Sequence, residues 1–99
     1  MFNFKQTKMM IANNINPIVP ERIRSFVKAV STAPAPNFKP YVCAETVEIH
    51  VYKNVCCVIF LGLRKAVNFE LIYPLIPLGY RCSCLTFTGS ALTIDIQNS

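Results

Sequence analysis

Two cysteines one residue apart, Cys82 and Cys84, come closest in type and spacing to a metal site. On a strand, both thiols would point to the same face. With Cys43 or His50 they would offer zinc the sulfur and nitrogen ligands of a tetrahedral site. Known zinc knuckles space their cysteines by roughly two to four residues, and the sequence has no second close pair. We therefore expect buried cysteines acting as small hydrophobic residues, with no cofactor.

A nucleophilic site is the second chemistry that these residue types offer. His50 is the only histidine, and it would serve a cysteine or serine as general base, with Asp95 orienting its ring. Nothing in the local sequence places these residues together, and His50 follows Glu48 on one face of an expected strand, where a solvated role is ordinary. The sequence therefore predicts no enzyme.

The five cysteines also bear on the compartment. An odd number cannot form a closed disulfide framework. Cys56 and Cys57 are adjacent, so on a strand they would point to opposite faces. These features favour a reducing setting, in a virion or the cytoplasm. No secretory signal stands out, and the apolar run Val55–Leu63 is far shorter than the ~18–20 residues that span a bilayer.

Most of the cysteine, histidine and aspartate residues discussed so far lie in segments that are expected to form strands. Val47, Ile49 and Val51 alternate with polar residues, and Lys53-Asn54 fits a tight turn. An apolar run follows at 55–61, which predicts a central strand covered on both faces. Further strands are expected at 67–71, 80–88 and 92–96. The fold class is therefore mainly β (α+β), with an antiparallel five-stranded meander, sandwich or small barrel at 41–99.

A short amphipathic helix is expected at 20–32, before this β domain. Its apolar stripe, which would pack on the sheet or on other copies, is Ile23, Phe26, Val27 and Val30. Off the stripe lie the candidate contacts to a partner or nucleic acid, which are Arg22, Arg24 and Lys28. Residues 1–19 are expected to be an extended lead-in, and 33–40 a proline-rich, extended linker.

Charge is distributed unevenly along the chain. The first 40 residues carry six Lys or Arg and one Glu, a net +5, whereas residues 41–99 carry four of each sign and sum to zero. Charged residues make up only 15% of the chain and hydrophobic ones 53%. A small domain this poor in charge exposes apolar surface, so we expect it to self-assemble.

Residues 55–99 form a series of strands joined by Pro74-Leu75-Ile76-Pro77-Leu78-Gly79-Tyr80-Arg81 and ending in Leu92-Thr93-Ile94-Asp95-Ile96. This arrangement resembles the β-sandwich head domains of bacteriophage tail-fibre and receptor-binding proteins. The specific part of the resemblance is Pro77, Gly79, Tyr80 and Arg81. Cys82 stands where that family usually has proline, and the family adds closing strands beyond the position of Ser99.

The resemblance implies a non-enzymatic viral, phage-like structural or host-receptor-binding module. It also implies a homotrimer with a protein or saccharide receptor, attached through the basic helix and its linker. The alternative is a small basic accessory or regulatory protein that binds nucleic acid or a partner protein through residues 1–40. An open sheet edge near 92–96 would favour a partner in either case.

Overall fold

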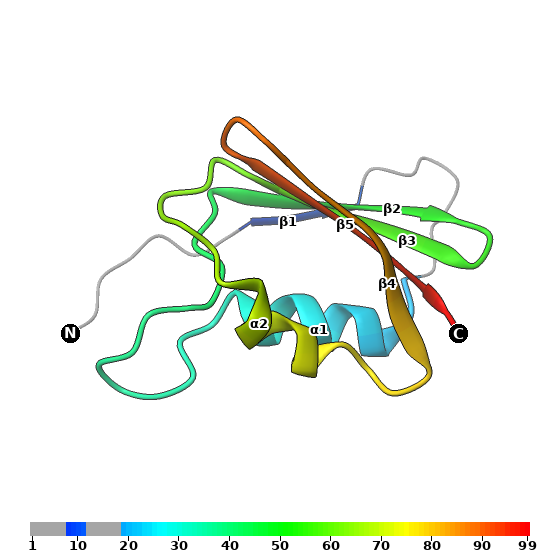
Figure 1. Ribbon diagram of the computed structural model, residues 1–99, viewed down its shortest axis with the longest axis horizontal. Coiled ribbons are helices and arrows are strands. Elements are labelled where there is room, and N and C mark those ends of the chain that lie inside the picture. Colours follow the sequence, from blue (N-terminus) through cyan, green and yellow to red (C-terminus); the bar gives the residue numbers. More distant parts are fainter. Residues whose placement is uncertain (1–7, 12–18) are drawn as a thin grey trace.

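A computed structural model describes residues 8–11 and 19–99. It holds one sheet in the order β1-β2-β3-β5-β4 (Figure 1). The strands are β1 Lys8–Ile11, β2 Thr46–Tyr52, β3 Val55–Leu61, β4 Tyr80–Thr88 and β5 Ala91–Asn98. Strands β2 to β5 pair antiparallel, and β1 adds to β2 in parallel. The prediction of a mainly β chain is confirmed.

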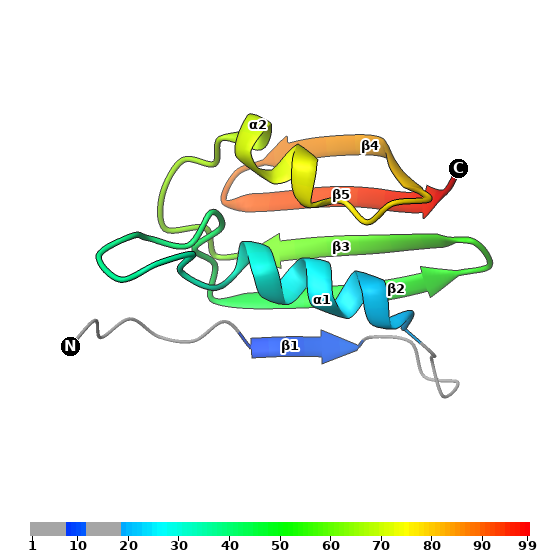
Figure 2. The same cartoon turned by 90° about the horizontal axis from the view of Figure 1, so that it is seen from below.

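The helices cover one face of the sheet, so the molecule has two layers (Figures 1 and 2). Helix α1 spans Glu21–Val30, within the predicted range, and α2 spans Phe69–Ile72, followed by the 3-10 turn η1 at Tyr73–Leu75. The carbonyl of Pro20 accepts hydrogen bonds from the first turn of α1, at 2.9 Å from Ile23 N and 3.1 Å from Arg24 N. In the described residues, no helix is long and apolar enough to cross a membrane.

The core lies between these layers. The whole predicted stripe of α1 is buried against alternate residues of the sheet, and the main members are Ile23, Phe26, Val27, Val30, Val47, Ile49, Val58, Phe60, Leu92, Ile94 and Ile96. Only one face of β3 is fully buried, since Cys56, Val58 and Phe60 alternate with half-buried residues. The prediction of a doubly covered strand is therefore wrong, because helices pack on one side of the sheet alone.

The predicted third strand at 67–71 is also wrong. Asn68 caps α2 there, and its Oδ1 accepts a hydrogen bond from Glu70 N at 3.0 Å. This cap satisfies a free N–H of the first turn, and Pro74 near the start of η1 suits the helical φ. Ile72 enters the core. The alternation of Val67, Phe69 and Leu71 was therefore a false strand signal.

The strand order differs from a meander because the segment at 67–71 forms no strand. The segment from Gly62 to Gly79 runs through α2 and η1 and delivers the chain to the outer side of β5, so β4 becomes an edge (Figure 2). The predicted open edge near 92–96 is wrong, because β5 lies between β3 and β4. The described residues form a single open sheet and no barrel or sandwich.

Two connecting segments also depart from expectation. The proline-rich segment turns back instead of extending, with Asn37 at φ 70° and Phe38 N bonded to Ala35 O at 3.1 Å. The predicted lead-in 1–19 contains β1, and its residues 1–7 and 12–18 lie outside the described residues. The parallel addition of β1 to β2 gives the sheet a fifth strand that sequence periodicity did not indicate.

Candidate interaction surface

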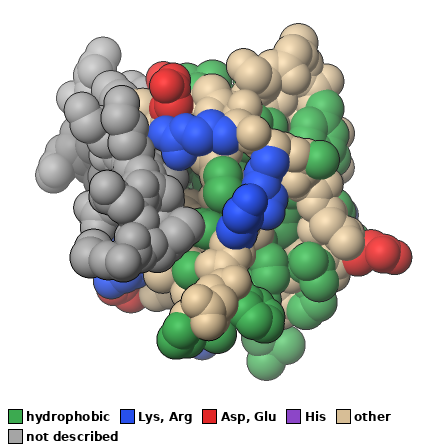
Figure 3. All heavy atoms as spheres, turned by 90° about the vertical axis from the view of Figure 1, so that its left-hand side faces the viewer, with side chains coloured by type: hydrophobic (Ala, Val, Ile, Leu, Met, Phe, Trp, Pro, Cys, Tyr) green, Lys and Arg blue, Asp and Glu red, His purple; other side chains and the backbone are tan. Residues whose placement is uncertain are grey.

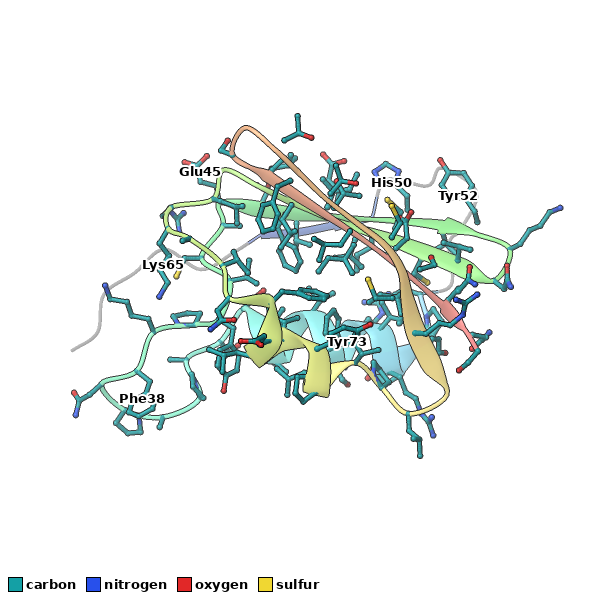
Figure 4. The ribbon with its side chains drawn as sticks, in the orientation of Figure 1. Phe38, Glu45, His50, Tyr52, Lys65 and Tyr73 are labelled. Atoms are coloured by element: carbon teal, nitrogen blue, oxygen red, sulfur yellow. The ribbon has the colours of Figure 1, made fainter. Side chains whose placement is uncertain are left out.

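The helix-free face of the sheet carries a row of polar and thiol side chains. His50 lies opposite Cys57, Cys57 opposite Asp95, and Asp95 opposite Cys84, so the row crosses β2, β3, β5 and β4. In antiparallel pairs, directly opposed residues share a face. Figure 4 shows His50 and Tyr52 pointing away from the helical layer that holds Tyr73. The fold thus brings together in one row four residues whose types serve elsewhere as catalytic groups or metal ligands.

The bonding within this row opposes nucleophilic catalysis. Burial raises the pKa of the Cys57 thiol to about 12, and its hydrogen bond to the Asp95 carboxylate adds to this. A thiol must lose its proton to attack, and this raised pKa keeps Cys57 protonated near neutral pH. The ring of His50 pairs with Glu48, with 3.0 Å between Nε2 and Oε1. His50 and Asp95 lie on β2 and β5 with β3 between them, which is not the arrangement of a base and its orienting carboxylate.

Cys82 and Cys84 do not point the same way. A β-bulge between them makes Cys82 the partner of Ile96 and Cys84 the partner of Asp95. Cys82 therefore packs on the core side, whereas Cys84 is exposed on the helix-free face. Burial raises the pKa of the Cys82 thiol, and its Sγ donates to Cys84 O at 3.4 Å. The sequence argument for two thiols on one face is wrong, because the bulge inserts Ser83.

The remaining zinc ligands are elsewhere. Cys43 precedes β2, with its Sγ 3.8 Å from Pro40 O. His50 is paired with Glu48 on β2, and β3 separates that strand from β5. Across residues 8–11 and 19–99, no three His, Cys, Asp or Glu side chains are arranged to hold a metal ion.

The three basic residues of α1 are exposed but do not form one patch. Arg24 and Lys28 are four residues apart, which places them on one flank of the helix. Arg22 lies on the other flank, where its Nη1 donates to Leu78 O at 2.9 Å. That bond ties α1 to the loop before β4.

A shallow apolar groove lies beside this bond, between α1 and η1. It encloses about 440 Å³ and is lined by Phe26, Ala29, Leu75, Pro77 and Leu78, with Glu21, Arg22 and Ser25. Leu78 is 90% exposed. Other large apolar side chains are also at the surface, among them Phe38 at the turn of 33–40. The face seen in Figure 3 has many hydrophobic side chains and few charged ones.

The free edge of β4 is the most extended of these surfaces. The strand has nine residues, of which six are exposed. No described helix or strand besides β5 makes an extensive contact with it. Phe87, near its end, is 50% exposed. Such an edge presents a row of unpaired N–H and C=O groups that can bind another strand.

No family model, curated protein or solved structure matches this chain. The β4 edge is therefore assigned as the candidate interaction surface from its geometry. Sequence reasoning found the strand at 80–88 but missed that it is an edge. The signal that could have shown this is Asn68 followed by Pro74, since a cap and a proline argue for a helical crossover between 61 and 80.

Proposed function

We propose that this chain is a non-enzymatic binding module that self-assembles. The observation that supports this best is the β4 edge, which is nine residues long and mostly exposed. Edge strands in proteins that stay monomeric are usually short, charged, bulged or covered. Arg81 is the only charged residue of β4, so the Cys82–Cys84 bulge is the main feature that restrains pairing along this edge.

Surface composition supports the same proposal. Leu78 and Tyr52 are 90% and 64% exposed, and Tyr73 is 56% exposed. A chain of 99 residues buries a smaller share of its surface than a larger domain does. Association would remove such side chains from water at about 25 cal/mol per Å² of apolar area.

A role in a viral, phage-like particle is the further part of this proposal. It is supported by the resemblance of residues 55–99 to tail-fibre and receptor-binding heads. In the fold, Pro77, Gly79, Tyr80 and Arg81 form the turn into β4, with Tyr80 N bonded to Pro77 O at 3.0 Å. These residues deliver the chain to the edge. Co-purification of the chain with virus particles would test this part.

Size-exclusion chromatography with light scattering tests self-assembly. Over a micromolar concentration series of the full chain, we expect a mass that is a multiple of 11.1 kDa. A monomer at every concentration would overturn the proposal.

A second candidate function, binding of nucleic acid or a partner protein through residues 1–40, is favoured by the exposed pair Arg24 and Lys28. It predicts salt-sensitive binding to a mixed-sequence oligonucleotide. Arg24→Gln with Lys28→Gln should abolish that binding. Arg22→Gln should weaken it less, because Arg22 is engaged with Leu78 O. Binding that is equal in all variants would exclude this function.

A further inference from the structure

The outer edge of β4 exposes the backbone groups of particular residues. The two-residue turn Gly89–Ser90 joins Thr88 to its partner Ala91, and such hairpins close with a hydrogen-bonded pair. Since bonded and non-bonded pairs alternate in an antiparallel ladder, Thr86 and Thr88 bond inward to β5. The N–H and C=O groups of Leu85 and Phe87 therefore point outward.

On the other side of the bulge, the even-numbered residues of β4 point their backbone groups outward, whereas on the first side the odd-numbered residues do. Gly79 O accepts a hydrogen bond from Ser99 N at 2.9 Å, which makes Gly79 and Arg81 the inward-bonding residues there. Tyr80 and Cys82 are then the outward ones. The N–H of Tyr80 already bonds to Pro77 O, so Tyr80 contributes its carbonyl alone.

We infer that the occupant of this edge is a second copy of the chain, paired antiparallel about a two-fold axis between Ser83 and Cys84. In this register Tyr80 faces Phe87 of the second copy, and Cys82 faces its Leu85. Every outward residue of one edge thus meets an outward residue of the other. The two bulges meet at the axis, so neither interrupts the pairing. The inference rests on the proposed self-assembly and specifies its partner and surface.

Side chains favour the same register. Cys82, Leu85 and Phe87 lie opposite buried residues of β5, so they share the helix-covered face. Pairing would set the half-exposed Phe87 against Tyr80 of the second copy and near its exposed Leu78. Aromatic residues that face each other across two strands stabilise a sheet.

Charge also permits a second copy here. On the helix-free face, Arg81 would lie opposite Thr86 of the second copy, so no like charges meet across the axis. Residues 41–99 have no net charge, with four Lys or Arg against four Asp or Glu. The result would be one continuous sheet through both copies, with the helices of both on the same side.

Light scattering of matched variants tests the pairing. Phe87→Lys places a charge on the edge and should raise the dimer dissociation constant by roughly tenfold or more. Ser90→Lys makes the same charge change in the exposed turn and should leave the dimer intact. Circular dichroism must show that Phe87→Lys stays folded, which its 50% exposure favours.

Charge pairing tests the register itself. Thr86→Glu would face Arg81 of the second copy twice in the dimer and should tighten it about threefold to tenfold. Thr86→Lys should weaken the dimer by a similar factor, and Arg81→Glu combined with Thr86→Lys should restore it. If Thr86→Glu and Thr86→Lys shift the dissociation constant equally, the register is wrong.

Cys84 provides an independent readout. It is the exposed one among the five cysteines, all of which lie in the described residues. The two copies of Cys84 would lie beside the axis on one face, so added diamide, which takes up the two thiol hydrogens, should join them in a disulfide. Cys84→Ser should abolish the cross-linked dimer. Failure of the wild-type chain to cross-link overturns the pairing.

The outcomes separate this inference from the proposed function. A wild-type monomer would overturn both. A trimer, or a dimer unaffected by Phe87→Lys, would overturn the β4 pairing and leave self-assembly standing.

Discussion

The two faces of the sheet follow the same strands but have opposite character. On the helix-covered face Ile49, Val58 and Phe60 are fully buried, and the described residues include no buried polar or charged residue. On the other face, Glu48, Cys57 and Asp95 are half-buried and bonded to one another or to their neighbours. Burial on the helix-covered side therefore specifies the fold, while the other side carries the polar and thiol groups.

Removal of a large side chain from each face should give the greatest contrast. Phe60→Ala should cost about 3–5 kcal/mol of unfolding free energy, because it leaves a cavity under the helices. Ile59→Ala, its neighbour on the helix-free face, should cost roughly 1 kcal/mol, since Ile59 is only half-buried. Urea denaturation measures both. Equal losses would mean that the helix-free face is covered in solution.

A glycine at the end of β3 should give the next largest effect. Gly62 has φ 69°, and a Cβ there would come within 2.7 Å of Glu45 Oε1 and 2.9 Å of Glu45 Cγ. Gly62→Ala should therefore cost about 2–3 kcal/mol, from backbone strain and from displacing Glu45.

Gly89 is the matched control for this prediction. It has φ 60°, and nothing lies within 4 Å of the Cβ position. Gly89→Ala should cost only the strain, about 1 kcal/mol. If the two losses are equal by thermal denaturation, the Glu45 side chain moves aside freely.

The thiol row of the helix-free face should make stability depend on alkaline pH. The pKa of Cys57 is raised from 9.0 to about 12 in the folded chain, so the unfolded chain loses this proton first. The stabilisation is complete below pH 9.0 and is lost as the pH rises from there to about 12.

Cys57→Ser keeps a donor for Asp95 but does not titrate in this range. The denaturation midpoint of the wild type should therefore fall more steeply than that of the variant above pH 9.0. Parallel pH profiles for wild type and Cys57→Ser would show that Cys57 ionises alike in both states.

Sequence patterns predicted the covered face well and the connections poorly. The stripe of α1 and the alternation of β2 and β5 follow directly from the period of apolar residues. The order of the strands does not, because periodicity carries no information on which strands are neighbours. The bulge at Ser83 had no sequence signal, so the predicted relation of Cys82 to Cys84 failed. Phe69 and Leu71 alternate as in a strand, yet the Asn68 cap and Pro74 decided for a helix.

The turn that joins β2 to β3 provides the smallest test, since it holds both faces in register. Lys53 is the left-handed residue there, with φ 48°. Lys53→Gly should relieve the strain and stabilise the chain by roughly 0.5 kcal/mol, because the greater freedom of glycine in the unfolded chain offsets part of the gain. Asn54→Gly, next to it, should not stabilise. Because Tyr52 pairs with Val55 across this turn, a gain at Asn54 instead would mean that Asn54 and not Lys53 holds the left-handed conformation.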